Sequence, residues 1–284
     1  MIKNNISNCF VNQTNKLKMF DESNSSIIER IRERLEEEFK HNVTLYDSID
    51  IERIRTDSWQ VERFIQEYHH ENETFDAILK TLKWRKSERV NEINENDFFK
   101  ELWTLFNLEI HGHDHHGRII HWMTWQNVSI PKDIIDLAYR FSIYITEQMD
   151  RMAGRNGCTS IINVRHASLR DIRIDFFRIL IKIPKHYPGL MRMWLFVDQP
   201  YFLRTVSNLL LNIVDDKIRK RVAFIANNEL TRYINQELIP ESLNGSRKFV
   251  QPINVPSIND CYDRLGLEIK ICDEVEKALK NVQK

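Results

Sequence analysis

The sequence predicts an α/β fold in which a helical segment precedes a mostly parallel sheet with crossover helices. In residues 26–106 the apolar residues recur at helical spacing. From Leu108 onward, short apolar runs of strand length alternate with long helices that are apolar on one face. Strands that alternate with helices form parallel pairs joined by crossover helices, so we expect a largely parallel sheet after residue 107.

Composition excludes several classes of function. The chain has 284 residues, enough for one large domain or two small ones. Its 41 Lys and Arg residues balance its 41 Asp and Glu residues, so general electrostatics do not favour nucleic acid as a partner. With seven glycines and neither GxGxxG nor GxxxxGK[ST], the chain carries no nucleotide-binding loop, and we expect no cofactor.

Cysteine usage and the N-terminus indicate a cytoplasmic chain. Cys9, Cys158, Cys261 and Cys272 have no metal or redox spacing, which favours reduced thiols. Residues 1–22 are rich in Asn and Lys and lack an apolar core of signal-peptide length, so we expect a disordered tail. No apolar run approaches the ~20 residues of a membrane span. Any association with a membrane is therefore expected to be peripheral.

Residues 23–106 are predicted to form a helical subdomain. A first helix, 26–40, has Ile27, Ile31, Leu35 and Phe39 on one face. Its polar face is as acidic as it is basic, which favours a packing helix over a membrane-surface helix. Further helices are expected from Asp57, over 73–90, and from Asn96 as the cap of a brief helix ending near residue 106.

Residues 107–250 are predicted to form the sheet domain. A hairpin is expected from the runs 108–111 and 118–125, with Asp114 and Gly117 in its turn. Strands are predicted at 158–164, 193–197 and 221–226, and helices at 131–152, 200–214 and 229–236.

Residues 251–284 are predicted to be a linker and a C-terminal helix over 257–281. Ser257 followed by Asp260 resembles a capping box, and an apolar stripe runs from Ile258 to Leu279. The stripe could dock on the domain or bind a protein partner.

The histidines near the hairpin are the strongest candidates for metal chemistry. His111, His113, His115 and His116 flank Asp114, and imidazole and carboxylate are zinc ligands. Because two of them are adjacent at a turn tip and no distant set completes a site, we expect a solvated turn and no metal. The sequence also lacks a GxSxG elbow and an activated cysteine motif, which favours a binding protein over an enzyme.

The apolar helix 200–214 is the strongest candidate for function. Its apolar residues recur on one face directly after a strand, at the edge where α/β folds bind ligands: Phe202, Val206, Leu209, Leu210 and Ile213. We predict that this helix is the movable wall of a lipid pocket. Further wall candidates, each of which could be plain core, are Phe141, Ile145, Met149, Phe177 and Leu180.

Three ordered blocks carry a resemblance to a known family. They comprise segments of the N-terminal helices (63–65, 75–77, 84–86), the hairpin turn 113–118, and the run Tyr187-Pro188, Asp198-Gln199-Pro200 and Phe202. Over residues 26–250 the chain is similar to the CRAL-TRIO lipid-binding family. Within the family, 50–54, 84–86 and 110–112 are most like the N-terminal domain of motile sperm domain-containing protein 2. That likeness implies a fragment of a longer, anchored protein at the endoplasmic reticulum, or a free-standing relative.

The resemblance implies a monomeric lipid carrier or sensor with one lipid between the sheet and helix 200–214, which opens at a membrane. Arg221 and Ser160 are the implied headgroup contacts. The departures from the family pattern are Gly189, in place of an acidic residue of the phosphatidylinositol-binding members, Asn163 and Asn244-Gly245. They count against phosphatidylinositol as the ligand. The alternative is a protein-interaction or membrane-contact adaptor with a vestigial or permanently filled pocket.

Overall fold

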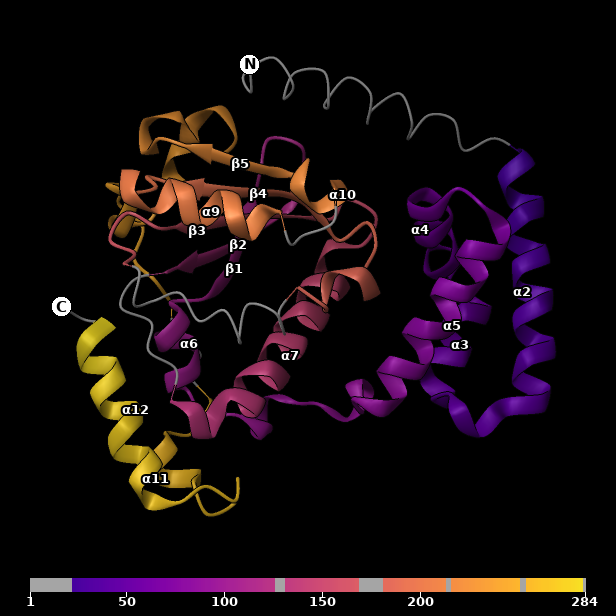
Figure 1. Ribbon diagram of the computed structural model, residues 1–284, viewed down its shortest axis with the longest axis horizontal. Helices are drawn as coiled ribbons and strands as arrows, with labels where there is room; N and C mark the ends of the chain where they lie inside the picture. Colours follow the sequence, from indigo (N-terminus) through magenta and orange to yellow (C-terminus); the bar gives the residue numbers. More distant parts are fainter. Residues whose placement is uncertain (1–21, 126–130, 169–180, 213–215, 251–253, 283–284) are drawn as a thin grey trace. The chain divides into compact units, whose positions relative to one another are not determined.

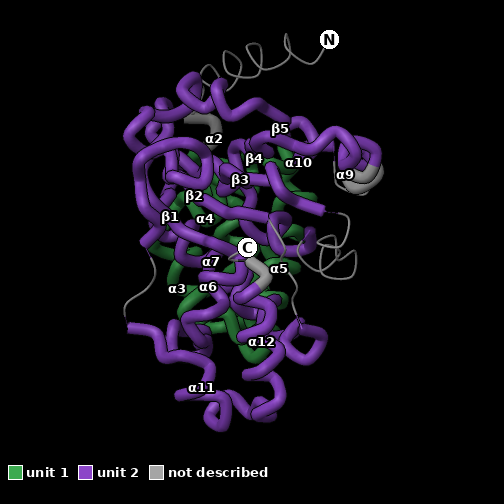
Figure 2. The backbone as a smooth tube through the Cα atoms, turned by 90° about the vertical axis from the view of Figure 1, so that its left-hand side faces the viewer, with its two compact units in different colours: residues 1–91 green, residues 92–284 purple. Residues whose placement is uncertain are grey.

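The computed structural model describes residues 22–125, 131–168, 181–212, 216–250 and 254–282. The chain separates into two compact units, Met1–Asn91 and Glu92–Lys284 (Figure 2). The predicted tail lies outside the described residues, except for Glu22, at which the first described helix begins. No helix within the described ranges combines the length and the apolar content needed to cross a bilayer.

In its described part, residues 22–91, the first unit contains four α-helices: α2 (Glu22–Asn42), α3 (Ser48–Thr56), α4 (Trp59–Tyr68) and α5 (Glu71–Ser87) (Figure 1). Ile31 and Leu35 of α2 are fully buried in one apolar cluster with residues of α3, α4 and α5, so α2 is a packing helix as predicted. Asp57 Oδ1 accepts a hydrogen bond of 2.9 Å from the Trp59 backbone N–H at the start of α4.

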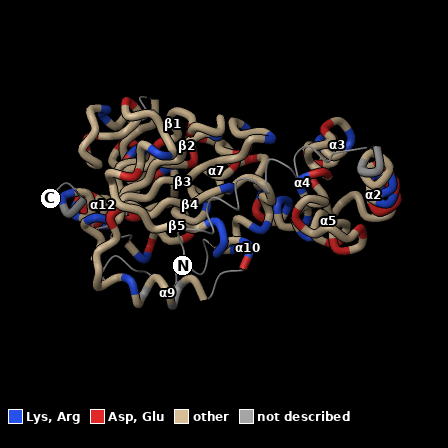
Figure 3. Tube along the Cα trace, turned by 90° about the horizontal axis from the view of Figure 1, so that it is seen from above, with Lys and Arg blue, Asp and Glu red and all other residues tan. Residues whose placement is uncertain are grey.

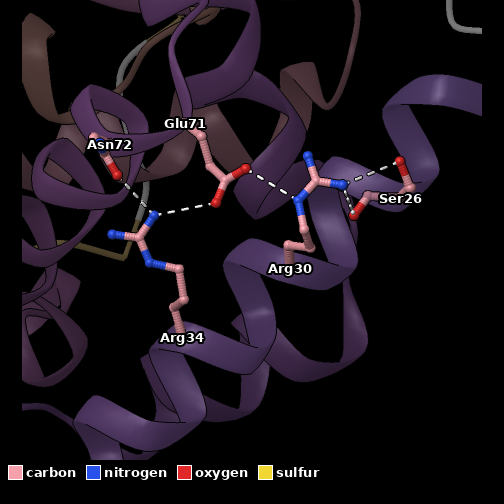
Figure 4. A network of polar contacts seen from close by, with 5 residues as sticks. All are labelled: Ser26, Arg30, Arg34, Glu71 and Asn72. Atoms are coloured by element: carbon pink, nitrogen blue, oxygen red, sulfur yellow. Dashed lines mark hydrogen bonds and ion pairs between the residues drawn. The ribbon is translucent and has the colours of Figure 1, made fainter.

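A polar network joins α2 to the start of α5 (Figure 4). Glu71 lies between Arg30 and Arg34, with nitrogen-to-oxygen distances of 3.1 and 3.2 Å, and Arg34 also donates to Asn72 Oδ1. The hydrogen bond from Arg30 is the main cause that holds the pKa of Glu71 below its usual value. Acidic and basic residues are interspersed along α2 (Figure 3), which gives the helix a mixed polar face opposite its buried stripe.

The second unit contains a five-stranded sheet in the order β1-β2-β3-β4-β5. Its strands are β1 (Glu109–His113), β2 (Ile119–Thr124), β3 (Cys158–Asn163), β4 (Met191–Val197) and β5 (Val222–Ile225). The pair β1–β2 is antiparallel and the other pairs are parallel, which confirms the predicted α/β fold with its hairpin and mostly parallel sheet.

Among its described residues, the second unit contains the α-helices α6 (Glu101–Phe106), α7 (Ile135–Ala153), α9 (Arg204–Leu211), α10 (Asp216–Arg219), α11 (Ile258–Cys261) and α12 (Ile269–Val282). The predicted helix 200–214 begins as a 3-10 turn, Tyr201–Leu203, and its α-helical part ends at Leu211. The predicted helix 229–236 is a 3-10 helix, Asn227–Arg232.

Residues 92–106, which we had placed in the helical subdomain, lie in the second unit. The reason is aromatic packing, because the rings of Phe98, Trp103 and Phe106 lie 5.3, 4.6 and 6.1 Å from the ring of Phe141 on α7. The prediction of Asn96 as the cap of the brief helix was wrong, because α6 has Lys100 at its N-cap position. Asn94 caps the preceding 3-10 turn, Glu95–Asp97, and its side chain accepts from the Asn96 backbone N–H.

The predicted C-terminal helix 257–281 is broken into α11 and α12. Between them the backbone turns at Gly266, whose φ of 66° is a conformation that glycine adopts readily. The apolar stripe is buried at Val275 and Ala278, and α12 packs on α6. The preceding linker is held too, since the Lys100 backbone N–H donates to the Pro256 carbonyl oxygen at 2.9 Å. The helix therefore docks on its own unit.

The two faces of the sheet are covered differently. One face, the turn face, is covered by residues 227–249, with Asn163 Nδ2 donating to the Ser242 carbonyl at 3.4 Å and the Arg247 guanidinium 5.3 Å from the Trp122 ring. On the other face, the helix face, Met149 of α7 contacts Cys158, with 3.8 Å between the sulfur atoms. Leu203 packs with Ile162 on the helix face, and α9 runs beside the sheet (Figures 1 and 3).

Candidate functional site

The helix face of the sheet carries two rows of side chains set by the strand register. In the first row, His121 pairs with Ser160, Ser160 with Trp194, and Trp194 with Val222. In the second row, Met123 pairs with Ile162, Ile162 with Phe196, and Phe196 with Phe224. Because paired residues of neighbouring strands point to the same side, the members of a row lie side by side.

We call the large apolar members of these rows the apolar floor: Met123, Ile162, Trp194, Phe196 and Phe224. Ile162 is buried, whereas the other four are incompletely buried. Phe224 is 40% exposed and stacks on Phe196 with ring centroids 5.3 Å apart. Leu195 and Val197 lie on the turn face of β4, the strand that carries Phe196, and both are fully buried. Since burial of a large apolar side chain is worth about 1.5–3 kcal/mol, the helix face retains a driving force for covering the floor with apolar matter.

Two helices border the floor. Met149 of α7 contacts Cys158, which precedes both rows along β3. At the far end, Leu203 belongs to the same apolar cluster as Ile162. The floor therefore lies between α7 and the turn that leads into α9. This placement agrees with a lipid chain lying along the sheet.

We call the predicted movable wall, helix 200–214, the gate helix, and its first residues are exposed. Tyr201 is 80% and Phe202 is 56% exposed, whereas Leu203 is 5% exposed. We had placed Phe202 on the inner face, and in this structure Leu203 is the residue that packs on the sheet. Val206, Leu209 and Leu210 lie in α9, but their side chains, like the whole of Ile213, fall outside what the structure describes.

The turn that leads into α9 is anchored by a polar network at the carboxyl ends of three parallel strands. Arg165, after β3, donates from Nε and Nη2 to Asp198 Oδ2 at 2.9 and 2.6 Å. Asp198, after β4, also accepts at Oδ1 from the Asn227 backbone N–H at 2.8 Å. Its φ of 55° is uncommon for a residue other than glycine, and the paired carboxylate holds it in that conformation. Because Asp198 shortly precedes Pro200, this network fixes the point at which α9 leaves the sheet.

Two of the departures from the family pattern belong to the same network. Asn163 Oδ1 accepts from the Arg165 backbone N–H at 3.1 Å, and Asn244 Oδ1 accepts from Arg165 Nη1 at 3.2 Å. A third departure, Gly189, has a φ of 79°. A side chain at Gly189 would be strained, so the backbone itself disfavours an acidic residue there.

The remaining wall and headgroup candidates occupy varied places. Phe141, Ile145 and Met149 are buried, and Phe141 belongs to the aromatic cluster with α6. Arg221 is half-buried, with Nη1 3.4 Å from the Met191 carbonyl oxygen. Phe177 and Leu180 lie outside the described residues.

A buried polar pair, His121 and Ser160, lies in the first row beside the floor. His121 Nδ1 is 2.9 Å from Ser160 Oγ, and both residues are more than nine-tenths buried. Burial lowers the pKa of His121 to about 4, so the imidazole is neutral near neutral pH. Sequence reasoning proposed Ser160 but missed His121, Trp194 and Phe196. Alternation within the predicted strand 193–197 was the signal that could have found the last two.

The histidine-rich hairpin is organised by Asp114. Its Oδ1 accepts from the backbone N–H groups of His116 and Arg118 at 2.8 and 2.9 Å, and its Oδ2 accepts from Thr159 Oγ1 at 2.7 Å. These three hydrogen bonds occupy both oxygens of the Asp114 carboxylate. In the parts of the chain that the structure covers, no group of three or more His, Cys, Asp or Glu residues is placed to hold a metal ion.

A cavity of about 200 Å³ lies near the carboxyl ends of β2 and β3, lined by residues that include Glu109, Asn163, Ser242 and Arg247. Glu109 and Arg247 form an ion pair of 2.6 Å within it. The cavity shares Met123 with the apolar floor and contains none of the predicted gate or wall residues. It is smaller than the roughly 300–1,000 Å³ of small-molecule sites, so we do not assign the lipid to it.

The fold and the floor define an α/β domain with a partly open apolar sheet face. The model of the CRAL/TRIO domain family matches residues 106–245, and this part of the chain is a CRAL/TRIO domain. The crystal structure of Sfh5 superposes with a TM-score of 0.64 at 15% sequence identity, covering 90% of this chain and 99% of that one, which shows a shared fold.

Curated relatives match over a shorter stretch. The tyrosine-protein phosphatase non-receptor type 9 of Homo sapiens and that of Mus musculus are each 24% identical to this chain over 92 residues. Those residues are 32% of this chain and 16% of either relative, so the match spans a small part of the relatives' length.

Proposed function

We propose that this chain binds one lipid between the apolar floor and α9, and that it transfers the lipid between membranes or senses it. The single observation that carries the proposal is the incompletely buried apolar floor within a CRAL/TRIO domain, bordered by α7 and Leu203. Each acyl methylene exposed to water costs ~0.8 kcal/mol, so a lipid that crosses water needs a closed apolar site. We propose a non-enzymatic role as a monomer.

The exposed aromatic residues at the root of α9 support contact with a membrane. Tyr201 and Phe202 are both more than half exposed, and aromatic residues favour the membrane interface. We propose that they touch the bilayer while α9 moves away from the floor. The protein would then be cytoplasmic and peripheral on membranes.

The ligand is proposed to be a phospholipid or another lipophile without an inositol headgroup. Gly189 replaces the acidic residue of the phosphatidylinositol-binding members, and its positive φ supports that exclusion. We also propose that this chain is related to the N-terminal domain of motile sperm domain-containing protein 2. A longer form of the protein would then attach to the endoplasmic reticulum. Recruitment of a protein partner through α12 would require this helix to leave α6.

Two substitutions in α9 test the gate. Leu209→Glu and Leu210→Glu should each reduce extraction of labelled lipid from vesicles by about tenfold or more, because a charge facing the lipid costs more than ~1.4 kcal/mol. Met152→Glu is the matched control, since Met152 is 58% exposed on α7, and it should extract normally. Unchanged extraction by both α9 variants, with circular dichroism showing them folded, would remove α9 from the site.

A further inference from the structure

The pair formed by His121 and Ser160 is a polar feature beside an otherwise apolar floor. His121 is 6% and Ser160 is 1% exposed. Their neighbours in the first row are Trp194 and Val222, and the second row begins two residues further along the strands with Met123 and Ile162. Strand alternation therefore directs the imidazole to the side of the sheet that the proposed lipid covers.

One nitrogen of this imidazole has no assigned partner. Nδ1 lies 2.9 Å from Ser160 Oγ, whereas Nε2 is buried and has no hydrogen-bond partner among the residues that the structure describes. Buried polar atoms in proteins nearly always have a partner, and a site built to make a hydrogen bond strongly disfavours ligands that cannot complete it. The orphaned nitrogen thus points to a ligand atom.

We propose that His121 Nε2 donates a hydrogen bond to an uncharged ester carbonyl oxygen of the bound lipid, so that the site prefers acyl esters to their ether analogues. This inference rests on the proposed lipid-binding function. An uncharged oxygen is favoured because the row neighbours of the pair, Trp194 and Val222, supply no charge to balance an ionised group.

The donor and acceptor roles of the two side chains fit a carbonyl oxygen as the ligand atom. A neutral imidazole has one donor nitrogen and one acceptor nitrogen. When the Ser160 hydroxyl donates to Nδ1, the proton of the ring lies on Nε2 and is available to an acceptor. Burial keeps the pKa of His121 far below neutrality, so this neutral form persists at the pH of a binding assay.

The test compares two lipids that differ only at the carbonyl. Phosphatidylcholine vesicles are doped with a fluorescent diacyl phosphatidylcholine or with its dialkyl ether analogue of equal chain length, and extraction by the full chain is measured. The wild type should extract the diester about tenfold better, the effect of one hydrogen bond. His121→Leu should abolish that preference, so that the folded variant extracts the diester and the ether equally. His121→Gln, which keeps an N–H donor, should retain part of it.

Three other outcomes would contradict the proposal in different ways. Equal extraction of both lipids by the wild type would overturn the carbonyl contact and leave the lipid carrier intact. A preference that persists in a folded His121→Leu variant would assign the carbonyl to another residue. Extraction of neither lipid would overturn the proposed function, and this inference with it.

Discussion

At the scale of the residue, His121 couples the candidate site to pH. Its pKa is lowered to about 4 in the folded chain by burial, while an unfolded histidine titrates near 6.5. Between these values the unfolded state binds the proton and the folded state does not, so stability is complete above about pH 6.5 and is lost as the pH falls toward 4. The full difference is on the order of 3 kcal/mol.

This linkage predicts a difference between the wild type and His121→Leu. From pH 7.5 to 5, the wild type should lose about 2 kcal/mol more unfolding free energy than the variant, as measured by urea denaturation. Carboxylates that titrate in the same range contribute to both proteins and cancel in the comparison. Parallel pH profiles would show that His121 is solvated in the folded chain.

At the scale of the element, the C-terminal helix is the part whose role the sequence left open. The apolar stripe of residues 257–281 was compatible with docking or with a partner, because periodicity alone does not name the surface that a stripe meets. The structure buries it against α6, and the break at Gly266 was not predicted, because an isolated glycine is also tolerated within helices.

If α12 docks on α6, a carboxylate introduced on its buried side should lower stability far more than one introduced on its exposed side. Val275→Glu places a carboxylate at a fully buried position and should destabilise the second unit by at least about 3 kcal/mol. Lys277→Glu changes charge on the exposed side of the same helix and should stay within about 0.5 kcal/mol. Thermal and urea unfolding of both variants measure the difference. A folded Val275→Glu variant of wild-type stability would contradict the packing of α12 on α6.

At the scale of the whole molecule, the sequence predicted the fold class and the positions of the strands along the chain because hydrophobic period and turn chemistry are local signals. Asp114 and Gly117 marked the hairpin, and the strand near residues 193–197 was found from its apolar run. The boundary between units was displaced from residue 106 to residue 91, since the contact of Phe98 and Trp103 with Phe141 joins residues far apart in sequence.

The candidate site was predicted only in part, for the same reason. Helix 200–214 was recognisable from its own periodicity, and Ser160 entered through the family resemblance. The rows that bring His121 beside Ser160, and Phe196 beside Phe224, depend on strand register, which pairs residues from separate segments of the chain. Arg165 and Asp198 likewise meet only when β3 and β4 lie side by side.

Native mass spectrometry of the full chain, purified without detergent, tests the central claim most directly. A lipid carrier should be recovered with one lipid bound per chain, and it should exchange that lipid for a labelled one from vesicles. Recovery of the folded chain without any lipid, together with failure to extract labelled lipid, would contradict the account.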